Sequence, residues 1–559
     1  MSTMKIPYNR VHARGDVLFA ARGGKIHSFS LHDGKHISTW QHPDVEKVAD
    51  VVKATSKAQN EATVAMEVDD AQGADESEPP AKRQRRQDDD DADNAPAGDS
   101  ETTAADAATQ EKDKVHNNGE GKEEGKNKNK NKKGKFESKG HHFARVPDRP
   151  VITQVTSTAD GRHVLAVSGH DKIIWVFEHD GQGRLTQLSQ RTMPKRPSAV
   201  TITPDSQIIC ADKFGDVYSL PLIVIPRSPS STSRLSTPNP VSTRPSVPAA
   251  NTLTVHSKRN LEALNHQKKQ LELAKQKRGD TAKADGPDFE LTLLLGHVSM
   301  LTALVIGESE QRRYILTGDR DEHIRVSRYI PQAHVIESFC LAHEEFVGDI
   351  VIPASRGEIL VSGGGDEELF VWDWKAGKVL SKTSVLSLAR DIAPETSKVA
   401  VSGLYTLLYP SESGNLTYVV AISEGIKAIF SWQLTAENTL NNPSVMELPA
   451  NPLHLSASAA DNNAPPKLFV AVDPRQTPQA KSLHMFALTL NDGRLTVDTE
   501  PLIHDESLEA AEMEASESEI RSLLYTVENL RKQTGGGEGA GLEGAEADAA
   551  EIPATEDQE

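Results

Sequence analysis

The sequence contains very few cysteines and no long apolar run. Cys210 and Cys340 are the only two in 559 residues and lie far apart, which excludes a disulfide framework and a thiolate zinc site. No run approaches the roughly 20 apolar residues that a membrane-spanning helix needs, and the N-terminus lacks the apolar core of a signal peptide. We therefore expect an intracellular protein in a reducing compartment, with no membrane partner.

Sequence motifs for catalysis are also missing. The glycines at 363–365 precede the strand-like sequence ELFVWDW, whereas a nucleotide-binding glycine loop opens a helix. Gly539, Gly541 and Gly544 match the dinucleotide pattern literally, but no strand precedes them. There is no P-loop, no H-E-x-x-H and no G-x-S-x-G context. We expect a protein that is not an enzyme, with no catalytic, cofactor-binding or metal-binding residues of its own.

The charge is strongly negative and concentrated in a few segments. A net charge of -19 argues against a protein that binds nucleic acid by itself, because affinity for nucleic acid comes mostly from neutralising phosphates with Lys and Arg. Three segments are too polar to bury a core, and we expect disorder in the charged insertion 44–140, the Ser/Pro-rich and basic insertion 227–288, and the acidic tail 505–559.

Within these segments, three features each have two possible interpretations. The basic cluster Lys82–Arg86 predicts import into the nucleus, with the cytoplasm as a second compartment, or is only solubilising charge. The basic stretch 257–278 contacts tRNA backbone or is a partly helical linker. In the tail, apolar residues at helical spacing predict a short helix that packs on the propeller or on a partner, namely Ile520, Leu523, Leu524, Val527 and Leu530.

The remaining residues, about 330, consist of short β-branched runs closed by Gly and Asp turns, for example GRHVLAVSGHDKIIWVFEHDG. At the 40 to 45 residues that a WD repeat occupies, they fill about seven blades. The sequence therefore predicts an all-β WD-repeat β-propeller. We place its first blade at 1–43, blades two and three at 141–226, and blades four to seven at 289–504.

Two central repeats carry the WD signature most completely. Gly296-His297 leads to Asp321, and Ala342-His343 leads to Asp366 and then Trp372-Asp373. A His and an Asp that are both partly buried each need a partner to offset lost hydration, and they supply it to one another. The spacing thus predicts a structural network that holds the blades together, comprising His297, His343, Ser362, Asp366 and Trp372. Ser327 replaces the expected Trp in the fourth unit, so its network should be incomplete.

The runs GHVSMLTALV, ILTGDRDEHIRVSRY, ESFCLAHEEFV and VSGGGDEELFVWDW go beyond a repeat pattern. Over 293–378 the chain resembles the WD-repeat, non-catalytic subunit of the eukaryotic, fungal-type tRNA (guanine-N7-)-methyltransferase. The resemblance implies a heterodimer in which this subunit stabilises a catalytic partner. That partner would bind S-adenosylmethionine and form N7-methylguanosine in the variable loop of tRNA, and tRNA would be contacted through the complex.

The resemblance also implies a partner interface at Asp321, His323 and Arg325. Along the strand, Ile324 and Val326 point one way while His323 and Arg325 point the other. Arg325 could instead be a solvated or blade-edge charge, and Asp321 could serve the blade network with His297, the interface, or both. We expect Arg325→Glu to abolish co-purification of the partner while the propeller stays folded.

Two rival functions belong to other classes. A generic WD adaptor, such as a ubiquitin-ligase receptor or a chromatin scaffold, would share the fold but not the DEHIRVS run. A catalytic propeller would need a reactive constellation that the sequence does not offer. We therefore expect a scaffold subunit.

Overall fold

The computed structural model of the chain describes residues 3–48, 149–224, 258–277, 289–412, 414–458, 465–477, 481–500, 508 and 514–532. The basic cluster at 82–86 and the glycines at 539–544 lie outside these ranges. Among the residues that are described, no helix is long and apolar enough to span a membrane.

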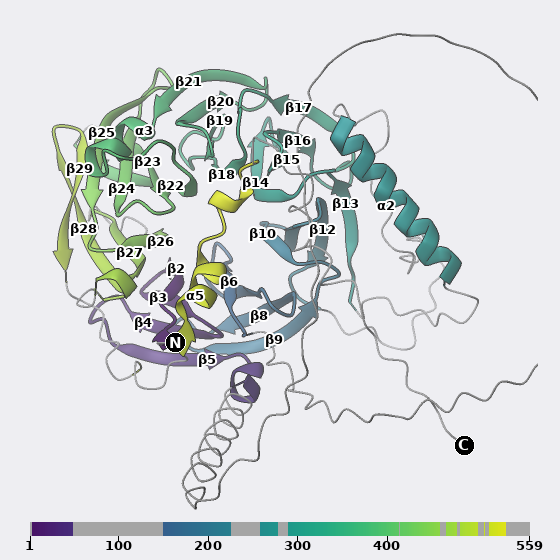
Figure 1. The fold of residues 1–559 in the computed structure, drawn as a ribbon. Helices are drawn as coiled ribbons and strands as arrows, with labels where there is room; N and C mark the ends of the chain where they lie inside the picture. The colour runs from purple at the N-terminus through teal and green to yellow at the C-terminus, as the bar shows by residue number, and fades with distance from the viewer. Residues whose placement is uncertain are drawn as a thin grey trace, which may run out of the picture. The chain divides into compact units, whose positions relative to one another are not determined.

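Seven antiparallel sheets of four strands follow one another around a ring, which confirms the expected seven-bladed β-propeller (Figure 1). Blades one and two comprise β2 (Tyr8–Arg14), β3 (Val17–Arg22), β4 (Lys25–Ser30) and β5 (His36–Gln41), then β6 (Ile152–Ser157), β7 (His163–Ser168), β8 (Ile173–His179) and β9 (Leu185–Thr192). Blades three and four comprise β10 (Pro197–Ile202), β11 (Gln207–Asp212), β12 (Asp216–Pro221) and β13 (Thr292–Gly296), then β14 (Leu301–Ser309), β15 (Arg312–Asp319), β16 (Ile324–Arg328) and β17 (Ile336–Cys340).

The remaining blades are each built from one continuous part of the chain. Blade five comprises β18 (Val347–Val351), β19 (Ile359–Gly364), β20 (Glu368–Asp373) and β21 (Lys378–Ser384). Blades six and seven comprise β22 (Val401–Ser411), β23 (Gly414–Ser423), β24 (Ala428–Leu434) and β25 (Leu440–Glu447), then β26 (Asn451–Ala457), β27 (Lys467–Asp473), β28 (Leu483–Asn491) and β29 (Arg494–Glu500).

The apolar core lies between the blades rather than in one central mass. Each pair of neighbouring blades shares one buried apolar cluster, including the pair formed by the last and first blades. Every residue of β3 and β19 is buried, because these second strands have a sheet on both faces, whereas the outer strands β5 and β21 alternate between exposed and half-buried residues. Packing between blades thus stabilises the ring.

Side chains, not a shared strand, close the ring between blades seven and one. Tyr8 and Phe29 pack against Phe469 and Met485, and the backbone N–H of Tyr8 donates to Ser482 Oγ at 2.8 Å. The two ends of the described chain pair separately, as β1 (Thr3–Lys5) with β30 (Glu514–Ser516).

The second insertion lies inside blade three rather than after it. We expected 289–504 to hold only blades four to seven, but β13 pairs with β12 and completes the sheet of blade three. The reason is that a WD repeat read from its Gly-His begins just after the outer strand of the preceding blade. TLLLG at 292–296 therefore looks like the start of repeat four although it closes blade three.

In the part of the chain that the structure describes, helices lie outside the blade strands. They include α2 (Lys258–Lys277), α3 (Leu386–Ile392) and α5 (Glu517–Leu524), with short 3-10 turns η1 (Pro474–Gln476) and η2 (Glu528–Leu530), and residues 44–48 are also helical. Ser516 begins α5 with a capping box to Glu519, and Ile520 packs against Ile6 and Ala515. The expected tail helix is thus confirmed only to Leu524, because Tyr525 leaves helical geometry and Leu530 falls in η2.

Candidate partner interface and the networks behind it

In blade five, all four residues predicted to form the structural network come together. Trp372 Nε1 donates to Ser362 Oγ at 2.8 Å, and Ser362 Oγ lies 2.7 Å from His343 Nε2. His343 Nδ1 lies 2.7 Å from Asp366 Oδ2. The arrangement fits the Nδ1–H tautomer of His343, in which Nδ1 donates to the carboxylate and Nε2 accepts from the serine. The relay links the third strand, the second strand, the entry loop and a turn of one blade.

Blade four contains a shorter version of this network, with a different carboxylate. His297 Nδ1 lies 3.2 Å from Asp319 Oδ2, and its Nε2 lies 2.9 Å from Thr317 Oγ1. Burial opposes ionisation of Asp319, but hydrogen bonds from His297 and His323 outweigh it and hold the pKa of Asp319 well below its ordinary value. The spacing pointed to Asp321 as the candidate partner of His297, and the structure corrects this to Asp319. Asp319 also stabilises the tight turn that follows it, because its Oδ1 accepts the backbone N–H groups of Asp321 and His323.

Arg325 lies inside blade four instead of projecting into solvent. It is 9% exposed; its Nε donates to Ser327 Oγ at 2.9 Å and its Nη1 to the carbonyl oxygen of Gly296 at 3.0 Å. Burial lowers the pKa of Arg325 to about 10. Its burial revises our expectation for Arg325→Glu: the new carboxylate would face the carbonyl oxygen of Gly296 without a donor, so we now expect this variant to destabilise blade four.

The accessible residues of the candidate interface lie in the turn between β15 and β16. His323 has a side chain that is 48% exposed and lies 3.7 Å from Asp319, and the hydrogen bond with that carboxylate raises the pKa of His323. Asp321 and Glu322 are both bound by Lys532, at 3.3 Å and 2.6 Å. The structure thus places Asp321 at the surface, in an acidic pair that faces the C-terminal segment.

That C-terminal segment, residues 525–532, crosses the ring over the turns between second and third strands (Figure 1, yellow). It contacts these turns in four successive blades. Tyr525 Oη donates to Asp473 at 2.5 Å, and the N–H of Val527 donates to Glu424 at 2.7 Å. Arg531 Nη1 donates to the carbonyl of Gly365 at 2.9 Å, and Arg320 Nε donates to the carbonyl of Leu530 at 2.8 Å. The surface around Asp321 therefore includes residues distant in sequence, which no local motif could reveal.

Exposed apolar side chains lie along the outer strand of blade four and directly after it. Phe339, on β17 and paired in register with Arg325, is 41% exposed, and Leu341 is 61% exposed. Interfaces commonly place exposed apolar anchors beside a polar rim. Together with His323, these side chains form the surface that we call the blade-four face.

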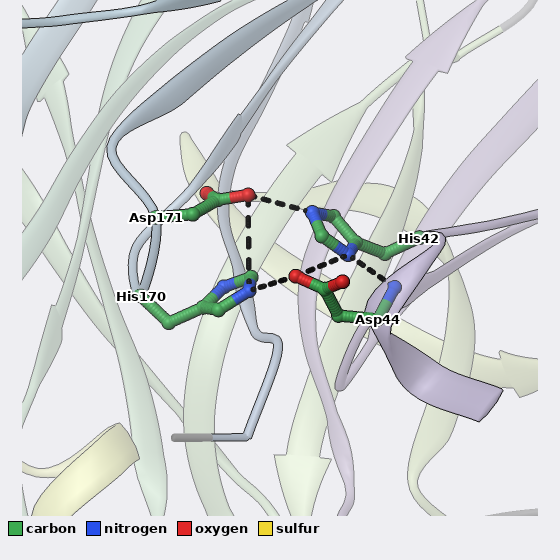
Figure 2. Close-up of side chains that lie close together, drawn as sticks. All are labelled: His42, Asp44, His170 and Asp171. Carbon is green, nitrogen blue, oxygen red and sulfur yellow. Dashed lines mark hydrogen bonds and ion pairs between the residues drawn. The ribbon is translucent and has the colours of Figure 1, made fainter. Parts of the chain in front are cut away.

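The sequence analysis missed a complete network in blade two. Trp175 Nε1 donates to Ser168 Oγ at 2.9 Å, and Ser168 in turn donates to Asp171. Figure 2 shows the next contact, in which His42 Nε2 lies 2.8 Å from Asp171 Oδ2. His42 precedes the first insertion while its partners follow it, so the repeat spacing was hidden. The signal was partly present in SGHDKIIWV, where Ser168, Asp171 and Trp175 occur in the same order as their counterparts in blade five. They stand three and four positions apart, whereas Ser362, Asp366 and Trp372 stand four and six apart.

Comparisons with known proteins agree with this architecture. The family model "tRNA methyltransferase TRM82 WD40 domain" matches residues 18–487. A protein of Sclerotinia sclerotiorum named "tRNA (guanine-N(7)-)-methyltransferase non-catalytic subunit trm82" is 36% identical over 568 residues, covering 95% of this chain and 99% of that protein. Relatives of the same name from Aspergillus clavatus and Aspergillus oryzae are 37% and 31% identical, covering 69% and 93% of this chain and 79% and 94% of theirs. The chain therefore belongs to the TRM82 WD40 family of tRNA methyltransferase subunits.

Proposed function

We propose that this chain is the non-catalytic subunit of a tRNA (guanine-N7-)-methyltransferase and not a generic WD adaptor. The observation that carries the proposal is the match to a relative of that name over nearly the full length of both chains. S-adenosylmethionine would bind to a separate catalytic subunit, and tRNA would be methylated by the heterodimer. This chain's own contribution is a rigid surface.

The mechanism is a shift in the partner's conformational populations. A rigid propeller that contacts one conformation of the catalytic subunit in preference to others raises the fraction competent for tRNA and methyl donor. The cores between all neighbouring blades supply the rigidity. The blade-four face, with exposed Phe339 and Leu341 beside the turn at 321–323, supplies apolar anchors and a polar edge.

The test of this function is reconstitution. We would purify the tagged chain from its own cells, identify the co-purifying protein, and measure guanine-N7 methylation of tRNA by that protein with and without this chain. We expect a methyltransferase as the main partner and methylation that depends on both chains. Co-purification of ubiquitin-ligase or chromatin components in its place would support the adaptor function and contradict our proposal.

The interface is tested on its exposed residues, because Arg325 is buried. Leu341→Glu and Phe339→Glu should weaken co-purification of the catalytic subunit at least tenfold, and because both side chains are exposed the melting temperature should not fall. Glu437→Lys, on an exposed turn between β24 and β25, is the control with an equally drastic charge change. Equal partner recovery with all three variants would exclude the blade-four face.

We also propose that the protein enters the nucleus through its basic cluster at 82–86. Replacing Lys82, Arg83, Arg85 and Arg86 by alanine should move a fluorescently tagged chain toward the cytoplasm. Replacing the basic residues at 128–135 instead is the control, because it removes similar charge from the same insertion. An unchanged nuclear fraction in the first variant would refute the proposal.

A further inference from the structure

Two histidines and two aspartates meet where blade one ends and blade two turns. His42 and Asp44 follow β5, whereas His170 and Asp171 lie in the turn between β7 and β8 (Figure 2). One ligand atom from each residue can be chosen so that all four lie within 4.8 Å of one another. Asp171 Oδ2 is 2.8 Å from His42 Nε2 and 3.7 Å from His170 Nε2, and Asp44 Oδ2 is 3.5 Å from His170 Nε2.

This cluster contains more polar groups than the blade network requires. In blade five, His343 uses both ring nitrogens on Asp366 and Ser362, and the network is complete. In blade two, Ser168 donates directly to Asp171, and His42 uses its ring nitrogens on Asp171 and on the backbone N–H of Asp44, which donates to Nδ1 at 3.1 Å. His170 and the side chain of Asp44 have no counterparts in the blade-five network, and His170 Nε2 faces the carboxylates of both Asp44 and Asp171. The extra pair therefore needs an explanation other than holding one blade together.

The polar contacts of the His170 ring are with carboxylates, and the ring also packs edge-on against His42. Its side chain is 11% exposed, its Nε2 faces Asp44 and Asp171, and its Nδ1 is buried with no hydrogen-bond partner within the described ranges. Asp44 directs Oδ1 to the exposed Lys47 at 2.7 Å and Oδ2 into the cluster. Two carboxylate oxygens and an imidazole nitrogen thus converge on one point from two different blades.

We propose that His42, Asp44, His170 and Asp171 bind a divalent transition-metal ion, of which Zn²⁺ fits best. Zn²⁺ takes four imidazole and carboxylate ligands at about 2.0–2.2 Å, which sets them about 3.3–3.6 Å apart around a tetrahedron. The separations of 3.5 and 3.7 Å from His170 Nε2 already match this spacing. The 2.8 Å contact between His42 and Asp171 must widen, and as Zn²⁺ takes Nε2 the imidazole proton moves to Nδ1, which then no longer accepts the backbone N–H of Asp44. Two imidazole ligands disfavour Mg²⁺ and Ca²⁺, which prefer oxygen.

The metal would join two consecutive blades. His42 and Asp44 lie at the end of blade one, and His170 and Asp171 lie in a turn of blade two. One ion bound by all four would therefore link the segments on either side of the first insertion. Its role is structural, since all four ligands come from the protein and none of the positions is left for a substrate. The site is independent of the proposed methyltransferase function.

The test is metal binding by the full-length chain. After chelation and gel filtration, we would titrate the protein with Zn²⁺ and measure bound metal by mass spectrometry, and then with Co²⁺ to record the visible absorption of a tetrahedral site. We expect one ion per chain. His170→Ala and Asp44→Asn should each weaken Zn²⁺ affinity at least tenfold and abolish the Co²⁺ spectrum, while Zn²⁺ should raise the melting temperature of the wild type only.

The control is His32→Ala, which removes a histidine that faces Asp16 at 3.7 Å on an exposed surface and should leave metal binding unchanged. Without metal, His170→Ala should melt near the wild type, because Trp175, Ser168, Asp171 and His42 remain. Asp44→Asn gives the answer even if His170→Ala fails to fold. No Zn²⁺ or Co²⁺ uptake by the wild type, or unchanged uptake by Asp44→Asn, would overturn the proposal.

Discussion

His343 Nδ1 lies 2.7 Å from Asp366 Oδ2, and both side chains are buried. Asp366 also accepts the backbone N–H of Glu344 at 2.9 Å, so one carboxylate satisfies two donors of the entry loop. Asp366→Ala would leave both donors without a partner. We expect it to lower the free energy of unfolding by about 3 to 5 kcal/mol, the usual cost of breaking a buried polar pair.

The measurement for Asp366→Ala is chemical denaturation with the wild type as reference. Asp33→Ala is the matched control, because Asp33 pairs with Lys35 in an exposed turn and its removal should leave the denaturation midpoint nearly unchanged. A denaturation midpoint for Asp366→Ala equal to that of the control would mean that the His-Asp pair does not stabilise blade five.

Local sequence spacing predicted the fold and the blade-five network, because His343, Ser362, Asp366 and Trp372 lie within one uninterrupted repeat. It failed where the partners are separated. His42 is divided from Asp171 by the first insertion, and β13 from β12 by the second. Local spacing also could not show that Arg325 is buried. Strand alternation predicts which side of the sheet a side chain faces, but not whether other residues cover that side. The partner interface itself stays a prediction.

Asp349, on the innermost strand of blade five, should give stability a distinctive pH dependence. Burial raises its pKa from 3.8 to about 6, although the nearby Arg10 opposes the shift. The folded state therefore holds this proton more tightly than the unfolded state, so the associated stability is complete below about pH 4 and is lost as the pH rises through about 6.

Asp349→Asn removes this loss and can keep the acceptor for the backbone N–H of Leu404, 2.8 Å away. Relative to the wild type, the variant should gain up to about 3 kcal/mol between pH 4 and pH 7, since the shift spans about two pKa units. Urea denaturation at several pH values checks this. A constant difference between the two proteins across that range would show that Asp349 does not titrate as described.

Lys532 holds the end of the C-terminal segment on the acidic pair Asp321 and Glu322. Lys532→Glu replaces both attractions with repulsion and should release this end of the segment. Because the three side chains are partly exposed, the cost to global stability should stay within about 1 kcal/mol. Limited proteolysis should cut the variant faster near residue 532. Lys532→Gln, which removes the charge without reversing it, is the second variant. If protease cuts both variants as slowly as the wild type, these ion pairs do not hold the segment.

The basic helix α2 offers a test of direct tRNA contact. Deleting 227–288 removes it but spares β12 and β13. If the helix lies along the tRNA backbone, the deletion should weaken tRNA binding by the heterodimer and reduce the slope of affinity against salt concentration. Binding assays at several salt concentrations decide this, and unaltered affinity and slope would leave α2 as a linker only.

The position of β13 has a consequence for synthesis on the ribosome. Blades one and two can complete their sheets as soon as their last strands emerge, but blade three presents β12 with an unpaired edge until Thr292–Gly296 follows. During that interval β12 has the backbone groups of an open edge, which other strands can recruit. The nascent chain is therefore most exposed to mispairing and to chaperone capture while the second insertion is being translated.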